Sequence, residues 1–80
     1  DKWMQLNKDG SAGYCFVRSG RFSLNSHCLL LKPRDKYKNK FNLDININII
    51  SLQISNMGFG FSNAISADKL NSIRIYVNME

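Results

Sequence analysis

The residues best able to do chemistry gather in one stretch, GYCFVRSGRFSLNSHCLLL, at positions 13–31. It holds both cysteines, Cys15 and Cys28, and the single histidine, His27. A structural zinc site needs four ligands, and neighbours such as His27 and Cys28 point to opposite faces of a strand. A nucleophilic cysteine needs a histidine base within reach, and the same alternation turns His27 away. We therefore expect neither a zinc site nor a catalytic thiol.

A structural role suits the two cysteines better. The segments 14–18 and 27–32 read as strands around the turn-forming stretch SGRFSLNS, and a hairpin closing near residues 21 and 22 would set Cys15 opposite Cys28. We therefore predict a Cys15–Cys28 disulfide, worth about 3 kcal/mol in the chain-entropy model. Such a bond favours a secreted or periplasmic protein. Two inert buried thiols are the alternative.

The acidic residues give no sign of catalysis. No two of them have the spacing of a catalytic pair, and they occur in turn-like or solvent-facing contexts. GFG at 58–60 lacks the strand and the Lys-Ser or Lys-Thr that a phosphate-binding loop requires. We expect no enzyme, no metal and no cofactor. The six acids are Asp1, Asp9, Asp35, Asp44, Asp68 and Glu80.

Positive charge is concentrated in one segment. The chain carries 11 Lys and Arg against 6 Asp and Glu, and KPRDKYKNK at 32–40 holds five of the basic residues. This segment is either a solvated loop or a patch for an anionic partner. A single aromatic residue within it is fewer than a single-strand nucleic-acid binder usually shows. The candidate binding surface consists of Lys32, Arg34, Lys36, Tyr37, Lys38, Lys40 and Trp3.

Length and hydropathy indicate one small domain, residues 1–80. A chain of this size buries only about 60% of the surface that its unfolded form exposes, so a covalent staple would help. No apolar run approaches the length that crosses a bilayer. The chain starts at Asp1. We expect a mature product whose signal peptide has been removed, with a trimmed chain as the alternative.

Period-two patterning dominates the predicted elements. FNLDININI alternates apolar and polar residues from 41 to 49, and the phase flips at Ile49–Ile50, which predicts one long strand over 41–54 with a β-bulge. Further strands are expected at 3–6 and 72–78, and Ser62–Asn71 is an optional short helix capped by Ser62. The expected fold class is mainly β, a small curved antiparallel sheet or barrel with a disulfide hairpin.

The layout resembles a known family. YCFV and HCLLL, followed by SIRIYV, are similar to the receptor-binding B subunits of bacterial A–B toxins, in the subtilase-cytotoxin and pertussis-like group. The similarity covers mainly Tyr14–Leu31 and Leu70–Val77. It implies a secreted oligonucleotide/oligosaccharide-binding barrel that assembles as a pentamer and binds sialylated or other glycans. None of the family's sugar-binding residues carries over to a position here.

These observations favour a binding protein over an enzyme. The leading hypothesis is a secreted, oligomeric module that binds a glycan or a host-cell receptor as part of a toxin. The first alternative is a secreted effector or inhibitor that binds a host or competitor protein through a strand edge or the 32–40 segment. The second is a barrel-like nucleic-acid-binding domain, suggested by the sequence pI of about 9.5.

Overall fold

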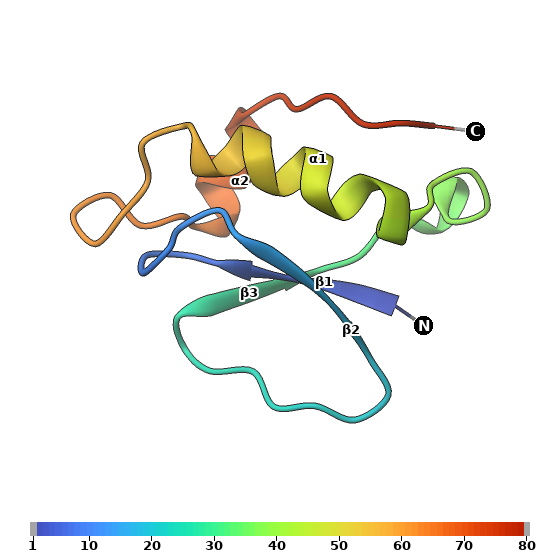
Figure 1. The fold of residues 1–80 in the computed structure, drawn as a ribbon, viewed down its shortest axis with the longest axis horizontal. Coiled ribbons are helices and arrows are strands. Elements are labelled where there is room, and N and C mark those ends of the chain that lie inside the picture. The colour runs from blue at the N-terminus through green and yellow to red at the C-terminus, as the bar shows by residue number, and fades with distance from the viewer. Residues whose placement is uncertain (1, 80) are drawn as a thin grey trace.

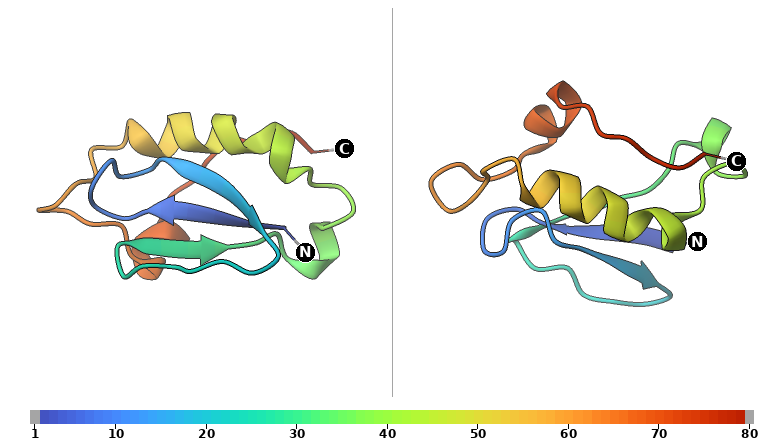
Figure 2. Two further views of the ribbon diagram at one scale, coloured as in Figure 1. Left: turned by 60° about the horizontal axis from the view of Figure 1, so that its bottom comes forward. Right: turned by 45° about the horizontal axis from the view of Figure 1, so that its top comes forward.

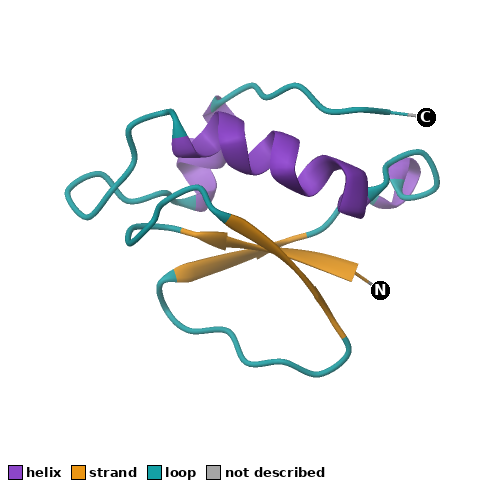
Figure 3. Cartoon of the chain, in the orientation of Figure 1, coloured by secondary structure: helices purple, strands orange, loops and turns teal. Residues whose placement is uncertain are grey.

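A computed structural model describes residues 2–79 as a three-stranded sheet with helices on one side (Figures 1 and 3). The elements in chain order are β1 (Lys2–Asn7), β2 (Cys15–Ser19), β3 (Cys28–Leu31), a 3₁₀ turn η1 (Asp35–Tyr37), α1 (Leu43–Ser55) and α2 (Ala67–Ser72). No helix among these residues is long and apolar enough to cross a membrane.

The sheet is antiparallel, and its first strand lies in the centre, giving the order β2-β1-β3. Met4 pairs with Val17 on one side and Leu31 on the other, so these three side chains share a face. That face looks towards the helices and carries the core. The buried apolar residues of the core are Met4, Leu6, Ala12, Leu43, Ile50, Ile54 and Ile65.

The long strand expected over 41–54 is wrong, because this segment forms α1. Asn42 caps the helix: its side-chain Oδ1 accepts a hydrogen bond from the Ile45 N–H at 3.1 Å. The buried positions of α1 are Leu43, Asn46, Ile50 and Ile54, spaced as one face of a helix. Ile45, Ile49 and Leu52, which the alternating pattern placed among the buried residues, are 48%, 39% and 66% exposed.

The strand expected over 72–78 is also wrong. Residues 73–79, which we call the C-terminal segment, are extended but form no strand, and their one β-bridge within residues 2–79 is between Phe41 and Met79. This segment runs beside α1, in the layer above the sheet (Figure 2). The optional helix over Ser62–Asn71 is confined to α2, and its cap is Ser66 rather than Ser62.

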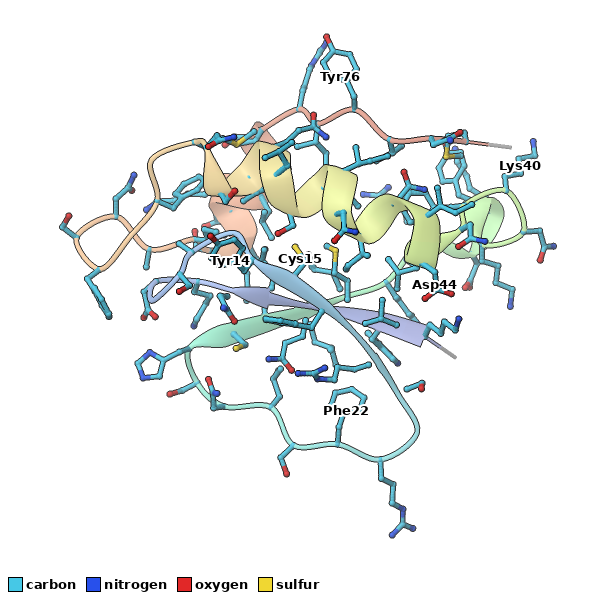
Figure 4. The ribbon with its side chains drawn as sticks, viewed as in Figure 1. Tyr14, Cys15, Phe22, Lys40, Asp44 and Tyr76 are labelled. Carbon is cyan, nitrogen blue, oxygen red and sulfur yellow. The ribbon has the colours of Figure 1, made fainter. Side chains whose placement is uncertain are left out.

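The predicted barrel is wrong, because the segment expected to supply its long curved strand, residues 41–54, forms α1 instead. Within residues 2–79, the sheet is open, with β2 and β3 as its two edges. The loop of residues 20–27 passes below the outer face of the sheet, and Phe22 lies beneath that face (Figure 4). It joins the two edge strands across β1 and is not a hairpin turn.

The Cys15–Cys28 disulfide is wrong for the same topological reason. β1 separates the two cysteines: Cys15 pairs with Leu6, and Cys28 pairs with Asn7. Two strand spacings place their Cα atoms about 9–10 Å apart, beyond the reach of about 7 Å for a disulfide. Because Leu6 and Asn7 are neighbours on one strand, the two thiols also face opposite sides of the sheet. Both are free.

Candidate ligand-binding cavity

An apolar cavity of about 480 Å³ lies between the sheet and the layer above it. Its position follows from the way α1 crosses the sheet: the helix packs on β2 and β1, and Leu31 of β3 faces the cavity together with residues of the C-terminal segment. A single extended segment fills this space less completely than a helix would. The lining residues are Met4, Leu31, Lys32, Pro33, Arg34, Tyr37, Phe41, Leu43, Ile50, Ile75, Val77 and Met79.

Two side-chain amides of α1 hold the C-terminal segment in place. Gln53 donates from Nε2 to the Tyr76 carbonyl and accepts the Tyr76 N–H at Oε1, each at 2.7 Å. Asn46 does the same with Asn78, donating to its carbonyl at 2.9 Å and accepting its N–H at 2.6 Å. Asn46 also donates to the Asn42 carbonyl at 2.9 Å and is fully buried. Each amide thus makes the two main-chain hydrogen bonds that a neighbouring strand would make with one residue of the segment.

This anchoring turns alternate side chains of the C-terminal segment into the cavity. Ile75, Val77 and Met79 line it, whereas Tyr76 points away from the molecule and is 86% exposed (Figure 4). The cavity is therefore roofed by a segment held largely through its main chain.

Two basic residues adjoin the cavity. Lys32 and Arg34 contribute to its lining and are exposed. Tyr37 from η1 also lines it, and the Lys36 ammonium lies 4.9 Å from the centre of the Tyr37 ring. A largely apolar lining that includes an exposed arginine suits a ligand that combines an apolar part with negative charge.

The structure brings together part of the predicted binding surface. Lys32 lies with its ammonium 4.7 Å from the centre of the Trp3 ring, on the outer side of the sheet. Lys38 lines a second, polar pocket rather than the cavity. Lys36 and Lys40 are exposed and line neither space, and Lys40 lies at the far end of the molecule from α2 (Figure 4).

The polar pocket, about 380 Å³ in volume, adjoins the cavity near the start of α1. Lys32, Pro33, Phe41 and Leu43 line both spaces. The remaining residues around the polar pocket are Lys2, Asp35, Lys38, Asn39, Asn42 and Asp44.

The cysteines and the histidine lie away from these spaces. Cys15 faces α1 (Figure 4), and burial raises the pKa of its thiol to about 11, with a smaller opposing effect of the Ser51 hydroxyl. His27 pairs with Asp9 through an Nδ1–Oδ2 contact of 2.9 Å, which, with the Gly10 N–H, lowers the pKa of Asp9. No three metal-ligating side chains come together within residues 2–79.

Sequence reasoning missed the residues that build the roof. Asn46 was assigned to the wet face of a strand, and Gln53 received no role. The available signal was their spacing of seven residues, which places two amides on the same face of a helix two turns apart.

The fold and the cavity define a small α+β domain, in which one helix crosses an open three-stranded sheet and leaves a cavity beside it. Comparison with protein-family models, characterised proteins and solved structures found no match. The resemblance to toxin B subunits therefore remains a prediction, although the barrel that it implied is not formed by residues 2–79.

Proposed function

We propose that this chain is a non-enzymatic binding protein that holds a small amphiphilic anion in the apolar cavity. The observation that carries the proposal is the presence of Arg34 in a lining that is, apart from Lys32, almost entirely apolar. The cavity volume of about 480 Å³ falls within the range of small-molecule sites. The hydrocarbon part of the ligand lies between Leu31 and the C-terminal segment, and its charged group stays with the cations.

The glycan, receptor and protein-binding hypotheses stay predictions. For glycan stacking, the rings of Trp3 and Tyr37 each have a lysine ammonium over one face. That arrangement leaves less ring surface for a sugar. The acidic partner predicted for the 32–40 segment has the same sign of charge as the ligand proposed here.

Three detergents with one chain length test the proposal. Dodecanoate, dodecyltrimethylammonium and dodecyl maltoside, each below its micelle concentration, are titrated into the full chain by calorimetry. We expect dodecanoate to bind about tenfold or more tightly than the cationic analogue, because a positive charge near a carboxylate contributes on the order of 1–4 kcal/mol.

Neighbouring residues of the C-terminal segment supply matched variants. Val77→Phe adds volume inside the cavity, whereas Tyr76→Phe changes a side chain that points outwards. The first should weaken dodecanoate binding and the second should not. Equal binding of all three detergents, or equal effects of the two variants, would overturn the proposal.

A further inference from the structure

The polar pocket and the apolar cavity adjoin each other and differ in their chemistry. They share four lining residues, Lys32, Pro33, Phe41 and Leu43. One half is lined by hydrocarbon and the other by charged and amide groups. A ligand that fills both must therefore be apolar at one end and strongly polar at the other.

The charges around the two halves set the charge of that ligand. Lys2, Lys32, Arg34 and Lys38 are balanced in part by two acids, Asp35 and Asp44, which leaves an excess of two positive charges. Lys2 is already paired with Asp44 at the start of α1. Lys32 holds its ammonium over the Trp3 ring, on the outer side of the sheet. The cations left to meet a ligand are therefore Arg34 and Lys38.

Amide donors add directional contacts in the polar half. Asn39 and Asn42 both line it, and each side chain carries two N–H donors. The Asn42 Oδ1 is occupied by the Ile45 N–H, which leaves its NH₂ group as the end of the side chain that can face a ligand. Ammonium and amide donors together suit a group with several acceptor oxygens.

We propose that this two-part site binds an alkyl phosphate, with the chain in the apolar cavity and the phosphate monoester in the polar pocket. A phosphate monoester carries about −1.5 to −2 charges at neutral pH and offers three acceptor oxygens to the Lys38 ammonium and the two amides. A carboxylate carries one charge and offers two oxygens. The proposal rests on the proposed function, because the chain of the ligand occupies the same cavity.

The experiment compares dodecyl phosphate, dodecanoate and inorganic phosphate by calorimetry with the full chain. We expect dodecyl phosphate to bind about tenfold more tightly than dodecanoate, since one additional negative charge near Arg34 and Lys38 contributes about 1–2 kcal/mol at high effective dielectric. Inorganic phosphate should bind far more weakly than dodecyl phosphate and compete with it. Binding of inorganic phosphate as tight as that of dodecyl phosphate would identify a free-phosphate site and overturn the two-part assignment.

Two lysines from the same segment serve as matched variants. Lys38 lines the polar pocket, whereas Lys36 is exposed and lies over the Tyr37 ring. Lys38→Gln should weaken dodecyl phosphate binding about threefold to tenfold and dodecanoate binding less, and Lys36→Gln should change neither appreciably. Equal losses for the two variants, or no preference for phosphate over carboxylate, would overturn this inference. The proposed function would still stand after such a result if dodecanoate binds and Val77→Phe weakens its binding.

Discussion

Removal of the Asn46 side chain should detach the end of the C-terminal segment. Asn46→Ala deletes three hydrogen bonds, two to the main chain of Asn78 and one to the Asn42 carbonyl. At about 1 kcal/mol net for each, and with about 0.5 kcal/mol regained because alanine is the better helix former, we expect a loss of about 2–3 kcal/mol. This is a large fraction of the roughly 4–12 kcal/mol expected for a chain of this size.

Asn48→Ala is the matched control. Asn48 lies on the same helix but is exposed, and it gains the same helix propensity on substitution. In urea unfolding followed by circular dichroism, the midpoint of Asn46→Ala should lie about 2 M below that of the unsubstituted protein, at a slope near 1 kcal/mol/M. The midpoint of Asn48→Ala should be unchanged or higher.

Amide hydrogen exchange locates the effect. In Asn46→Ala the N–H of Asn78 should exchange faster than in the unsubstituted protein, while the N–H of Tyr76 keeps its Gln53 partner. Equal urea midpoints for the Asn46 and Asn48 variants, together with unchanged exchange at Asn78, would refute the role assigned to the amide of Asn46.

Three further outcomes are expected. Gly13→Ala should destabilise the fold by more than Gly20→Ala in urea unfolding, because both have positive φ but only a Cβ at Gly13 would overlap the Ser55 backbone. His27→Ala should reduce the loss of stability between pH 5 and 2. The contact of His27 with Asp9 lowers the pKa of Asp9 from 3.8. The stabilisation from this contact is therefore full above pH 3.8 and is lost as the pH falls through the lowered pKa. In guanidinium without a reductant, a thiol reagent should titrate both cysteines, whereas a disulfide-bonded chain would give no thiol.

The three strands could be predicted from the sequence, but their order could not. Trp3, Cys15 and Cys28 all lie in segments whose composition favours strands, and each segment forms one. The turn residues between 19 and 26 suggested a hairpin, yet the edge strands pair with β1 instead. A local pattern fixes which residues extend, whereas the choice of neighbour depends on long-range contacts. The disulfide prediction failed at this step.

The helix α1 shows how two periodicities can coexist in one segment. Alternating asparagine and isoleucine match a strand, and both residue types are weaker helix formers than alanine or leucine. The same segment also places Leu43, Ile50 and Ile54 on one helical face. In the helix the buried amide of Asn46 is satisfied by Asn78, a partner 32 residues away. No local pattern in the sequence reveals that partner, and Asn46 was therefore predicted to face solvent.

The candidate site was only partly accessible to sequence reasoning. The cluster of charge in residues 32–40 drew attention to the segment that supplies Lys32, Arg34 and Lys38. The apolar half of the site comes from residues scattered over β1, β3, α1 and the C-terminal segment, which become neighbours only after folding. A cluster of charge can be recognised in the sequence because its residues are consecutive. A cavity depends on how the folded elements pack against one another, which the sequence does not show directly.

Because the C-terminal segment is held through hydrogen bonds to its main chain, the side chain of Tyr76 can be replaced by a chemical label. Gln53 holds this residue by its N–H and carbonyl, and the side chain is 86% exposed. A cysteine-directed fluorophore or an affinity handle installed there would report on the roof of the cavity without entering it. In a Tyr76→Cys chain, replacement of the two native cysteines would leave this position as the single labelling site. Energy transfer from Trp3 to a fluorophore at this site could then follow the distance between the two layers.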